Sequence, residues 1–234
     1  MFSSDSNDSH QSEDSNTNRG YLRKLLAENN GDALSDQQLV EYVLALVTPR
    51  RNTAPLARRL LAEFGSFAAL ANADSALLQK MSGMGRSSVA VLKFARIAAV
   101  RLLADPLVNE PVLSSWQALL DYLRADMVHL TVERVRILHL NSKNRLIRDE
   151  IMSEGSIDEV AIYPREVIKR ALALGSTAII LVHNHPSGDP SPSRQDIATT
   201  RDIIDVGSKL GLSVHDHIII GRDGHISLRT KGLI

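Results

Sequence analysis

The 234-residue sequence contains no cysteine. The protein therefore cannot form disulfides, bind metal through thiolates or use a cysteine nucleophile, so any metal ligands must be histidines and carboxylates. The sequence also lacks an apolar run of the ~20 residues that a membrane span needs, and its N-terminus has no apolar signal-peptide core. These absences predict a cytoplasmic protein with no membrane association, and a hydrophobic content of 44% suits a packed core.

The formal net charge is zero, but the charges are unevenly distributed. Residues 20–104 contain eleven Lys and Arg against six Asp and Glu, a net of +5. Residues 1–19 have one basic against four acidic side chains, and residues 105–234 have 15 against 17. A basic region of this size fits contact with a polyanion, and it fits an ordinary solvated surface equally well.

The N-terminal part of the sequence divides into a polar tail, a helical module and a linker. Residues 1–19 are rich in Ser, Asp and Asn, and because they can bury little apolar surface we expect a disordered tail. Residues 20–104 show helical patterns bounded by capping residues, prolines and glycines, which predicts a small all-α domain. Residues 105–111 contain prolines near both ends and predict a linker.

Residues 112–234 alternate between helix and strand patterns, which predicts a mixed α/β domain. A short, continuous apolar run that contains two adjacent isoleucines, residues 177–182, is typical of a fully buried strand. The other expected elements are a helix from Ser114 or Ser115, strands over 134–140 and 146–152, a helix from Pro164 to Gly175, a helix over 193–210, and closing strands over 213–220 and 225–228.

Metal-binding residue types follow the buried strand directly. His183 and His185 are two residues apart, so both imidazoles lie on one face if the strand continues past residue 182. A loop rich in proline and glycine comes next, and Ser193 and Asp196 then occupy the first turn of the following helix. Two histidines and one aspartate suit Zn²⁺ and leave a fourth position for water, as catalytic zinc sites require. Ser193 and Asp196 also match the start of a capped helix, and both interpretations hold together.

This spacing, His183-x-His185-x₇-Ser193-x-x-Asp196, resembles the JAMM signature of MPN-domain metalloproteases. Residues 110–234 more widely resemble the RadC-like branch of that family, through the run His-Asn-His-Pro-Ser-Gly-Asp-Pro-Ser-Pro-Ser-Arg-Gln-Asp and the segments 164–167 and 216–221. The resemblance implies a cytidine-deaminase-like three-layer α-β-α domain with a mixed sheet. It also implies that the two histidines and Asp196 bind zinc, and that Ser193 hydrogen-bonds the reacting oxygen.

The family also uses an upstream glutamate as general base. Glu150 and Glu154 both lie on the second predicted strand and share one face by the period of two, so spacing alone does not choose between them. The resemblance favours Glu150, because a glutamate followed five residues later by Gly155 and then Ser156 matches the RadC-like pattern. Glu150 would then take a proton from zinc-activated water.

The resemblance implies cleavage of an amide or isopeptide bond in a peptide or protein, although the family is traditionally labelled as DNA repair. Asn184 departs from the Ser or Thr that many JAMM proteases have between the histidines, which weakens the transfer of protease activity more than that of the metal site. His215 and His217 form a second His-x-His pair, in which His217, or Asp216 between them, either orients a metal ligand or belongs to the core.

Within the helical module, Gly83-Met84-Gly85 lies between two helical patterns and resembles a helix–hairpin–helix motif. Such a turn presents backbone N–H groups to a DNA phosphate without reading bases, and Lys80, Arg86 and Lys93 lie nearby. A purely structural hairpin is the alternative. For the whole chain, the alternatives to a zinc hydrolase are a DNA-binding adaptor with a structural metal site and a metal-dependent nuclease.

Overall fold

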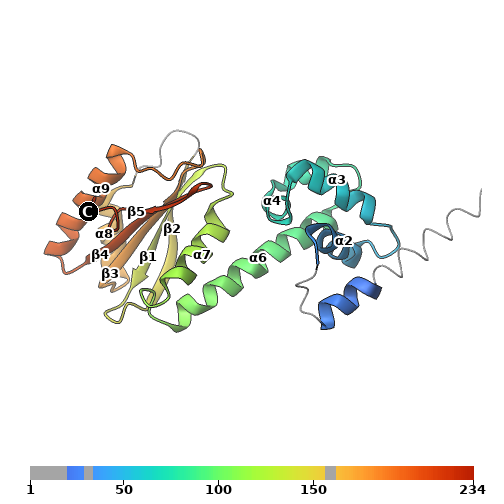
Figure 1. Cartoon of the computed structure of the whole chain (residues 1–234). Coiled ribbons are helices and arrows are strands. Elements are labelled where there is room, and N and C mark those ends of the chain that lie inside the picture. The colour runs from blue at the N-terminus through green and yellow to red at the C-terminus, as the bar shows by residue number, and fades with distance from the viewer. Residues whose placement is uncertain (1–19, 29–33, 156–161) are drawn as a thin grey trace, which may run out of the picture. The chain divides into compact units, whose positions relative to one another are not determined.

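A computed structural model describes residues 20–28, 34–155 and 162–234 (Figure 1). The tail predicted for residues 1–19 lies outside these described residues. The chain divides into two compact units between Ala98 and Ala99, called here the helical unit and the sheet unit. Within the described ranges, no helix combines the length and the apolar character that a membrane span requires.

The helical unit consists of short helices around a core of leucine side chains. The helices are α2 (Asp36–Val47), α3 (Ala54–Phe64), α4 (Phe67–Asn72), α5 (Ser75–Lys80) and α6 (Arg86–Asn109), whose later part belongs to the sheet unit. Ser35 begins α2 with a capping box, in which its hydroxyl accepts from the N–H of Gln38 and the Gln38 side chain accepts from the N–H of Ser35. Gly83, with φ +92°, turns the chain between α5 and α6, a backbone conformation that favours glycine.

The structure corrects the linker predicted for residues 105–111. Helix α6 continues to Asn109 and includes Pro106, although proline removes one backbone hydrogen bond from a helix interior. The neighbouring Leu107 is only 1% exposed, because it packs in the core of the sheet unit. This burial offsets the cost of the proline, since tertiary packing contributes more to helix stability than local propensity does.

Five strands form a mixed sheet: β1 (Glu133–Leu140), β2 (Leu146–Gly155), β3 (Ala178–Asn184), β4 (Ser213–Gly221) and β5 (Gly224–Ser227). Their order in the sheet is β2-β1-β3-β4-β5. The pairs β1–β2, β1–β3 and β4–β5 are antiparallel, whereas β3 and β4 are parallel and are joined through helix α9 (Arg194–Lys209).

Helices cover both faces of this sheet (Figure 1). Along β3, Ile180 and Val182 join the core shared with α7 (Trp116–Met127), whereas Ile179 and Leu181 join the core shared with α8 (Pro164–Ala173) and α9 (Arg194–Lys209). Every residue of β3 is buried because the strand is central and covered on both sides. The predicted three-layer α/β fold is therefore confirmed. By the same alternation, His183 lies on the α8 and α9 side.

Candidate metal centre

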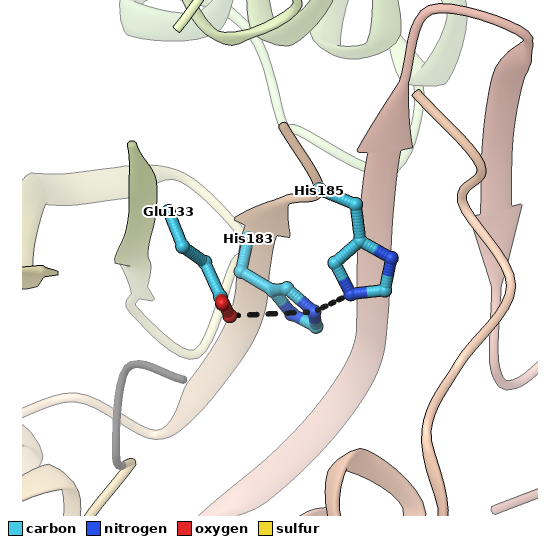
Figure 2. A group of neighbouring side chains, drawn as sticks. All are labelled: Glu133, His183 and His185. Carbon is cyan, nitrogen blue, oxygen red and sulfur yellow. Dashed lines mark hydrogen bonds and ion pairs between the residues drawn. The ribbon is translucent and has the colours of Figure 1, made fainter. Parts of the chain in front are cut away.

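The imidazoles of His183 and His185 face each other at the end of β3 (Figure 2). His183 is fully buried within the strand, and His185 follows its last residue. The N–H of His185 donates to the carbonyl of Ile220 on β4, which keeps the chain extended beyond the strand end. The two Nε2 atoms lie 2.9 Å apart. The expected convergence of the two histidines is thus present.

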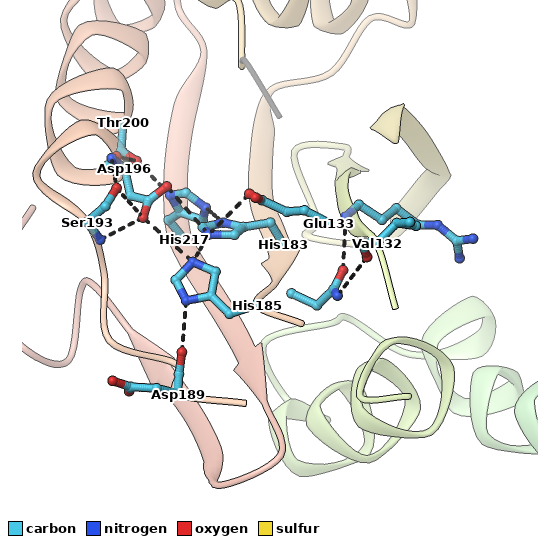
Figure 3. A network of polar contacts seen from close by, with 11 residues as sticks. Val132, Glu133, His183, His185, Asp189, Ser193, Asp196, Thr200 and His217 are labelled. Atoms are coloured by element: carbon cyan, nitrogen blue, oxygen red, sulfur yellow. Dashed lines mark hydrogen bonds and ion pairs between the residues drawn. The ribbon is translucent and has the colours of Figure 1, made fainter. Parts of the chain in front are cut away.

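Asp196 reaches the same place from the first turn of α9. The N–H and the hydroxyl of Ser193, the N-cap residue, both donate to Oδ2 of Asp196 at 2.7 Å. The other carboxylate oxygen, Oδ1, lies 3.4 Å from Nε2 of His183 (Figure 3). The capping box therefore fixes Oδ2 of Asp196, which lies 3.9 Å from Nε2 of His185, and leaves Oδ1 to face His183. Ser193 lies beside the site, and its hydroxyl contacts this carboxylate.

A glutamate that the sequence reasoning missed, Glu133, completes the group. Its Oε1 atom lies 4.0 Å from Nε2 of His183, and Glu133, His183 and His185 offer ligand atoms that all lie within 4.8 Å of one another (Figure 2). Glu133 begins β1 two residues before Val135, which pairs with His183, so period two places both side chains on one face. The signal that could have found it is the register between β1 and β3.

The structure does not bring Glu150 to the histidines. Glu150 lies near the middle of β2, opposite Ile137, and Arg170 of α8 donates to both of its carboxylate oxygens at 2.6 and 2.8 Å. Glu154, the alternative, pairs with Arg134 at 3.0 Å. Both predicted bases are thus engaged in ion pairs. The period of two gives only the face on which each glutamate lies, and that face does not specify how close the side chain lies to a site two strands away.

The loop after β3 determines which nitrogen of His185 carries a proton. Nδ1 of His185 lies 2.9 Å from the backbone carbonyl of Asp189. A carbonyl only accepts hydrogen bonds, so Nδ1 carries the proton and Nε2 presents a lone pair to the site. The loop packs on the β4–β5 turn, where the N–H of Asp223 donates to the carbonyl of Gly188. A Cβ atom on Gly221 would overlap that same carbonyl, so the close approach requires glycine.

Asn184, the residue that departs from the JAMM pattern, ties the end of β3 to the start of β1. Its side chain accepts from the N–H of Arg134 at 3.0 Å and donates to the carbonyl of Val132 at 3.1 Å. These two residues flank Glu133. The amide therefore holds the backbone on both sides of the carboxylate that meets the histidines.

His217 contacts the site from β4, whereas its neighbours do not. Its Nε2 atom lies 2.8 Å from Nδ1 of His183. Asp216 instead accepts hydrogen bonds from the N–H groups of His217 and Arg229, and His215 contacts Asn144 in the turn between β1 and β2. Among the described residues of this segment, only His217 contacts a histidine of the metal centre. The role of orienting a metal ligand is therefore supported at His217 alone.

Burial makes the inner histidines neutral. Desolvation lowers the pKa of His183 to about 4, although the carboxylate of Asp196 opposes the shift, and it lowers the pKa of His217 well below its usual value. Neutral imidazoles are the form that binds a metal. Beside His185, a recess of about 300 Å³ gives solvent a way to the group; it is lined by Thr131, Glu133, His185, Pro186 and Ser187.

Comparison with known proteins identifies the family to which the sheet unit is similar. Residues 113–233 match the protein family described as "RadC-like JAB domain". A UPF0758 protein of Rhodobacter capsulatus is 47% identical over 213 residues, which cover 91% of this chain and 100% of the relative. The matched family region spans all five strands and every residue of the candidate metal centre.

Proposed function

Because this chain belongs to the RadC-like JAB-domain family, we propose that it is a zinc-dependent hydrolase that cleaves an amide or isopeptide bond of a peptide or protein. One observation carries the proposal: the Nε2 atoms of His183 and His185 converge with the carboxylates of Asp196 and Glu133 beside an open recess. The family itself points to metal-dependent hydrolysis, and the metal and the bond are the parts that we add.

The donor set fits zinc. Catalytic zinc sites combine three imidazole or carboxylate ligands with one position left for water, and here His183, His185 and Asp196 would be those ligands. The lone pair on Nε2 of His185 already faces this group. A zinc ion supplies Lewis acidity, which makes a water molecule easier to deprotonate and polarises a carbonyl group.

We assign the general base to Glu133 in place of Glu150. Glu133 lines the recess next to His185, so its carboxylate can take a proton from a water molecule that enters there. Arg170 binds both oxygens of Glu150, and its hydrogen bonds hold the pKa of that carboxyl below its usual value, which makes Glu150 a weaker base.

Ser193 has two roles to separate. Its hydroxyl now donates to Asp196, so stabilising a developing oxyanion would require the hydroxyl to rotate toward substrate. If Ser193 stabilises the oxyanion, Ser193→Ala should lower kcat and leave KM largely unchanged. Ser193→Thr keeps a hydroxyl and should therefore keep a higher kcat than the Ala variant. Equal turnover of the Ala and Thr variants would leave Ser193 as a helix cap only.

The proposal is tested by metal content and hydrolysis together. The purified full chain should contain about one zinc per molecule. Hydrolysis of a library of peptides and isopeptide-linked peptides should stop with a chelator and return with Zn²⁺. Variants His183→Ala and Asp196→Ala should lose the metal. Zinc-free protein with chelator-resistant hydrolysis would contradict the proposal, and release of nucleotides from DNA by the zinc form would favour the nuclease alternative.

The glycine turn before α6, together with the basic charge of residues 20–104, supports a second candidate function for the helical unit, non-specific contact with DNA. The turn at Gly83 precedes the N-terminus of the long helix α6, which begins at Arg86. Lys93, expected nearby as a DNA contact, instead donates to the carbonyls of Ala71 and Ala73 inside the unit. Lys80 and Arg86 remain the candidates. Binding of duplex DNA should weaken steeply with added salt, and binding that is absent at low salt would exclude this function.

A further inference from the structure

A chain of three buried groups extends from helix α9 to the back of the metal centre. Thr200 and His217 are both fully buried, as is His183. The hydroxyl of Thr200 lies 2.5 Å from the carbonyl oxygen of Asp196 and 2.6 Å from Nδ1 of His217. Nε2 of His217 then lies 2.8 Å from Nδ1 of His183 (Figure 3). The chain therefore links a backbone carbonyl to a metal-facing imidazole.

The protons along this chain can be assigned from its hydrogen bonds. The carbonyl of Asp196 only accepts, so the single hydroxyl hydrogen of Thr200 must point toward it. The hydroxyl oxygen then accepts from Nδ1–H of His217. A neutral imidazole has one N–H, so Nε2 of His217 is an acceptor and the Nδ1 atom of His183 must carry the hydrogen. Nε2 of His183 is left with a lone pair, which faces the lone pair on Nε2 of His185 at 2.9 Å. Two facing lone pairs repel each other, and a cation bound by both nitrogens would remove that repulsion.

The opposite assignment would be harmful to metal binding. If the protons ran the other way, Nε2 of His183 would carry a hydrogen and would donate it to Nε2 of His185, 2.9 Å away. The metal would then have to displace that hydrogen. The opposite assignment would also turn the hydroxyl hydrogen of Thr200 toward His217. The hydroxyl oxygen of Thr200 and the carbonyl oxygen of Asp196 would then lie 2.5 Å apart without a hydrogen between them.

We propose that Thr200 and His217 are positioning residues that hold His183 in the tautomer whose Nε2 lone pair faces the metal, an inference that rests on the zinc site of the proposed function. Hydrogen-bonded partners of this kind raise the affinity of a site by fixing the ring orientation and the proton position of a ligand. Thr200 touches none of the lone pairs that face the site, so its influence passes entirely through His217 and the backbone of Asp196.

The first test compares Thr200→Val with Thr200→Ser in the full chain. Valine keeps the branched shape and removes the hydroxyl, whereas serine keeps the hydroxyl and removes a methyl group. Zn²⁺ affinity, measured by competition with a chromophoric chelator, should fall about 10- to 100-fold in the valine variant and should stay near the wild-type value in the serine variant. Equal affinity in the two variants, high or low, would overturn the proposal.

The second test reads the tautomer directly. In ¹⁵N-labelled, zinc-free protein, the imidazole ¹⁵N shifts of His183 should show a protonated Nδ1 in wild type and in Thr200→Ser. The valine variant should shift toward a protonated Nε2. Replacing His217 by Gln, whose carbonyl can accept from His183, should preserve both tautomer and affinity better than His217→Leu. A wild-type His183 protonated on Nε2 would overturn the proposal.

These outcomes are separate from those of the proposed function. The tautomer measurement uses no metal and no substrate. Wild-type protein that has the predicted tautomer and binds zinc but cleaves no peptide would contradict the proposed hydrolase function. It would leave the positioning role of Thr200 and His217 intact. Zinc-dependent hydrolysis combined with equal zinc affinity of the valine and serine variants would do the reverse.

Discussion

A buried histidine of the sheet meets a glutamate at two places in this protein. Nε2 of His139 lies 3.8 Å from Glu150, and Nε2 of His183 lies 4.0 Å from Glu133. The surroundings differ: Arg170 binds both oxygens of Glu150, so a cation already neutralises that carboxylate. At the other place the histidine faces a second imidazole and a second carboxylate instead.

The comparison separates an ion pair that supports the fold from a metal centre. Proximity of histidine and glutamate is common to both, so it identifies neither. At the His183 place, lone pairs from three different elements, β3, the loop after it and α9, converge on one point beside a recess. Around His139, the other ring nitrogen, Nδ1, meets the hydroxyl of Ser176, and the ring faces no second imidazole among the described residues.

The largest expected difference lies between Glu133→Gln and Glu150→Gln. The first substitution removes the proposed base and should lower kcat about 10²- to 10⁴-fold without loss of zinc. The second should leave turnover close to wild type, because Glu150 contacts Arg170 and not the site. Steady-state kinetics with parallel zinc analysis measures both. Loss of turnover in the Glu150 variant alone would contradict our assignment of Glu133 as the general base and of Glu150 as a structural ion-pair residue.

A pH effect on stability should come from the His139 place. Burial lowers the pKa of His139 to about 4 from its usual 6.5. Below pH 6.5 the unfolded chain binds a proton here that the folded chain does not bind, so the free energy of unfolding falls as the pH falls toward 4. The loss is on the order of 2 to 3 kcal/mol.

His183 and His217 are also buried and neutral, so this prediction is tested as a difference. Urea unfolding of the zinc-free wild type and of His139→Leu, each followed from pH 7 to pH 4, should give a shallower pH dependence for the variant. Parallel curves would show that His139 does not contribute.

The smallest expected effect concerns the loop that holds His185. Gly221→Ala should displace the Gly188 carbonyl and, with it, the Asp189 carbonyl that fixes the ring of His185. Zinc affinity should fall about tenfold, as for the loss of other groups that orient metal ligands. Gly85→Ala is the matched control, because a Cβ there meets nothing within 4 Å. Similar zinc affinities for the two variants would contradict this role of the loop.

The sequence predicts those parts of the fold and site that depend on local pattern. Strand β3 is continuous and apolar because it is covered on both faces, and α9 begins at a capping box that also brings Asp196 to the histidines. Such features need only residues a few positions apart. The positions of His183, His185 and Asp196 could therefore be predicted together.

The parts that local pattern does not specify depend on contacts between distant segments. Glu133 reaches the site only through the pairing of Val135 with His183, a register that the spacing within either strand does not contain. The continuation of α6 past Pro106 similarly depends on the burial of Leu107 against the sheet unit. Proline chemistry alone predicts a break there, and tertiary packing overrides it.

Asp196 stabilises the start of a helix with the same carboxylate that faces the histidines. Its Oδ2 accepts from the N–H of Ser193, and the N–H of Ile197 donates to the carbonyl of Ser193 in the same turn. A metal that holds the carboxylate in place would restrain fraying of this turn, and its removal would allow these amides to open more often. Hydrogen exchange in the first turn of α9 therefore reports whether the centre holds a metal, without any substrate.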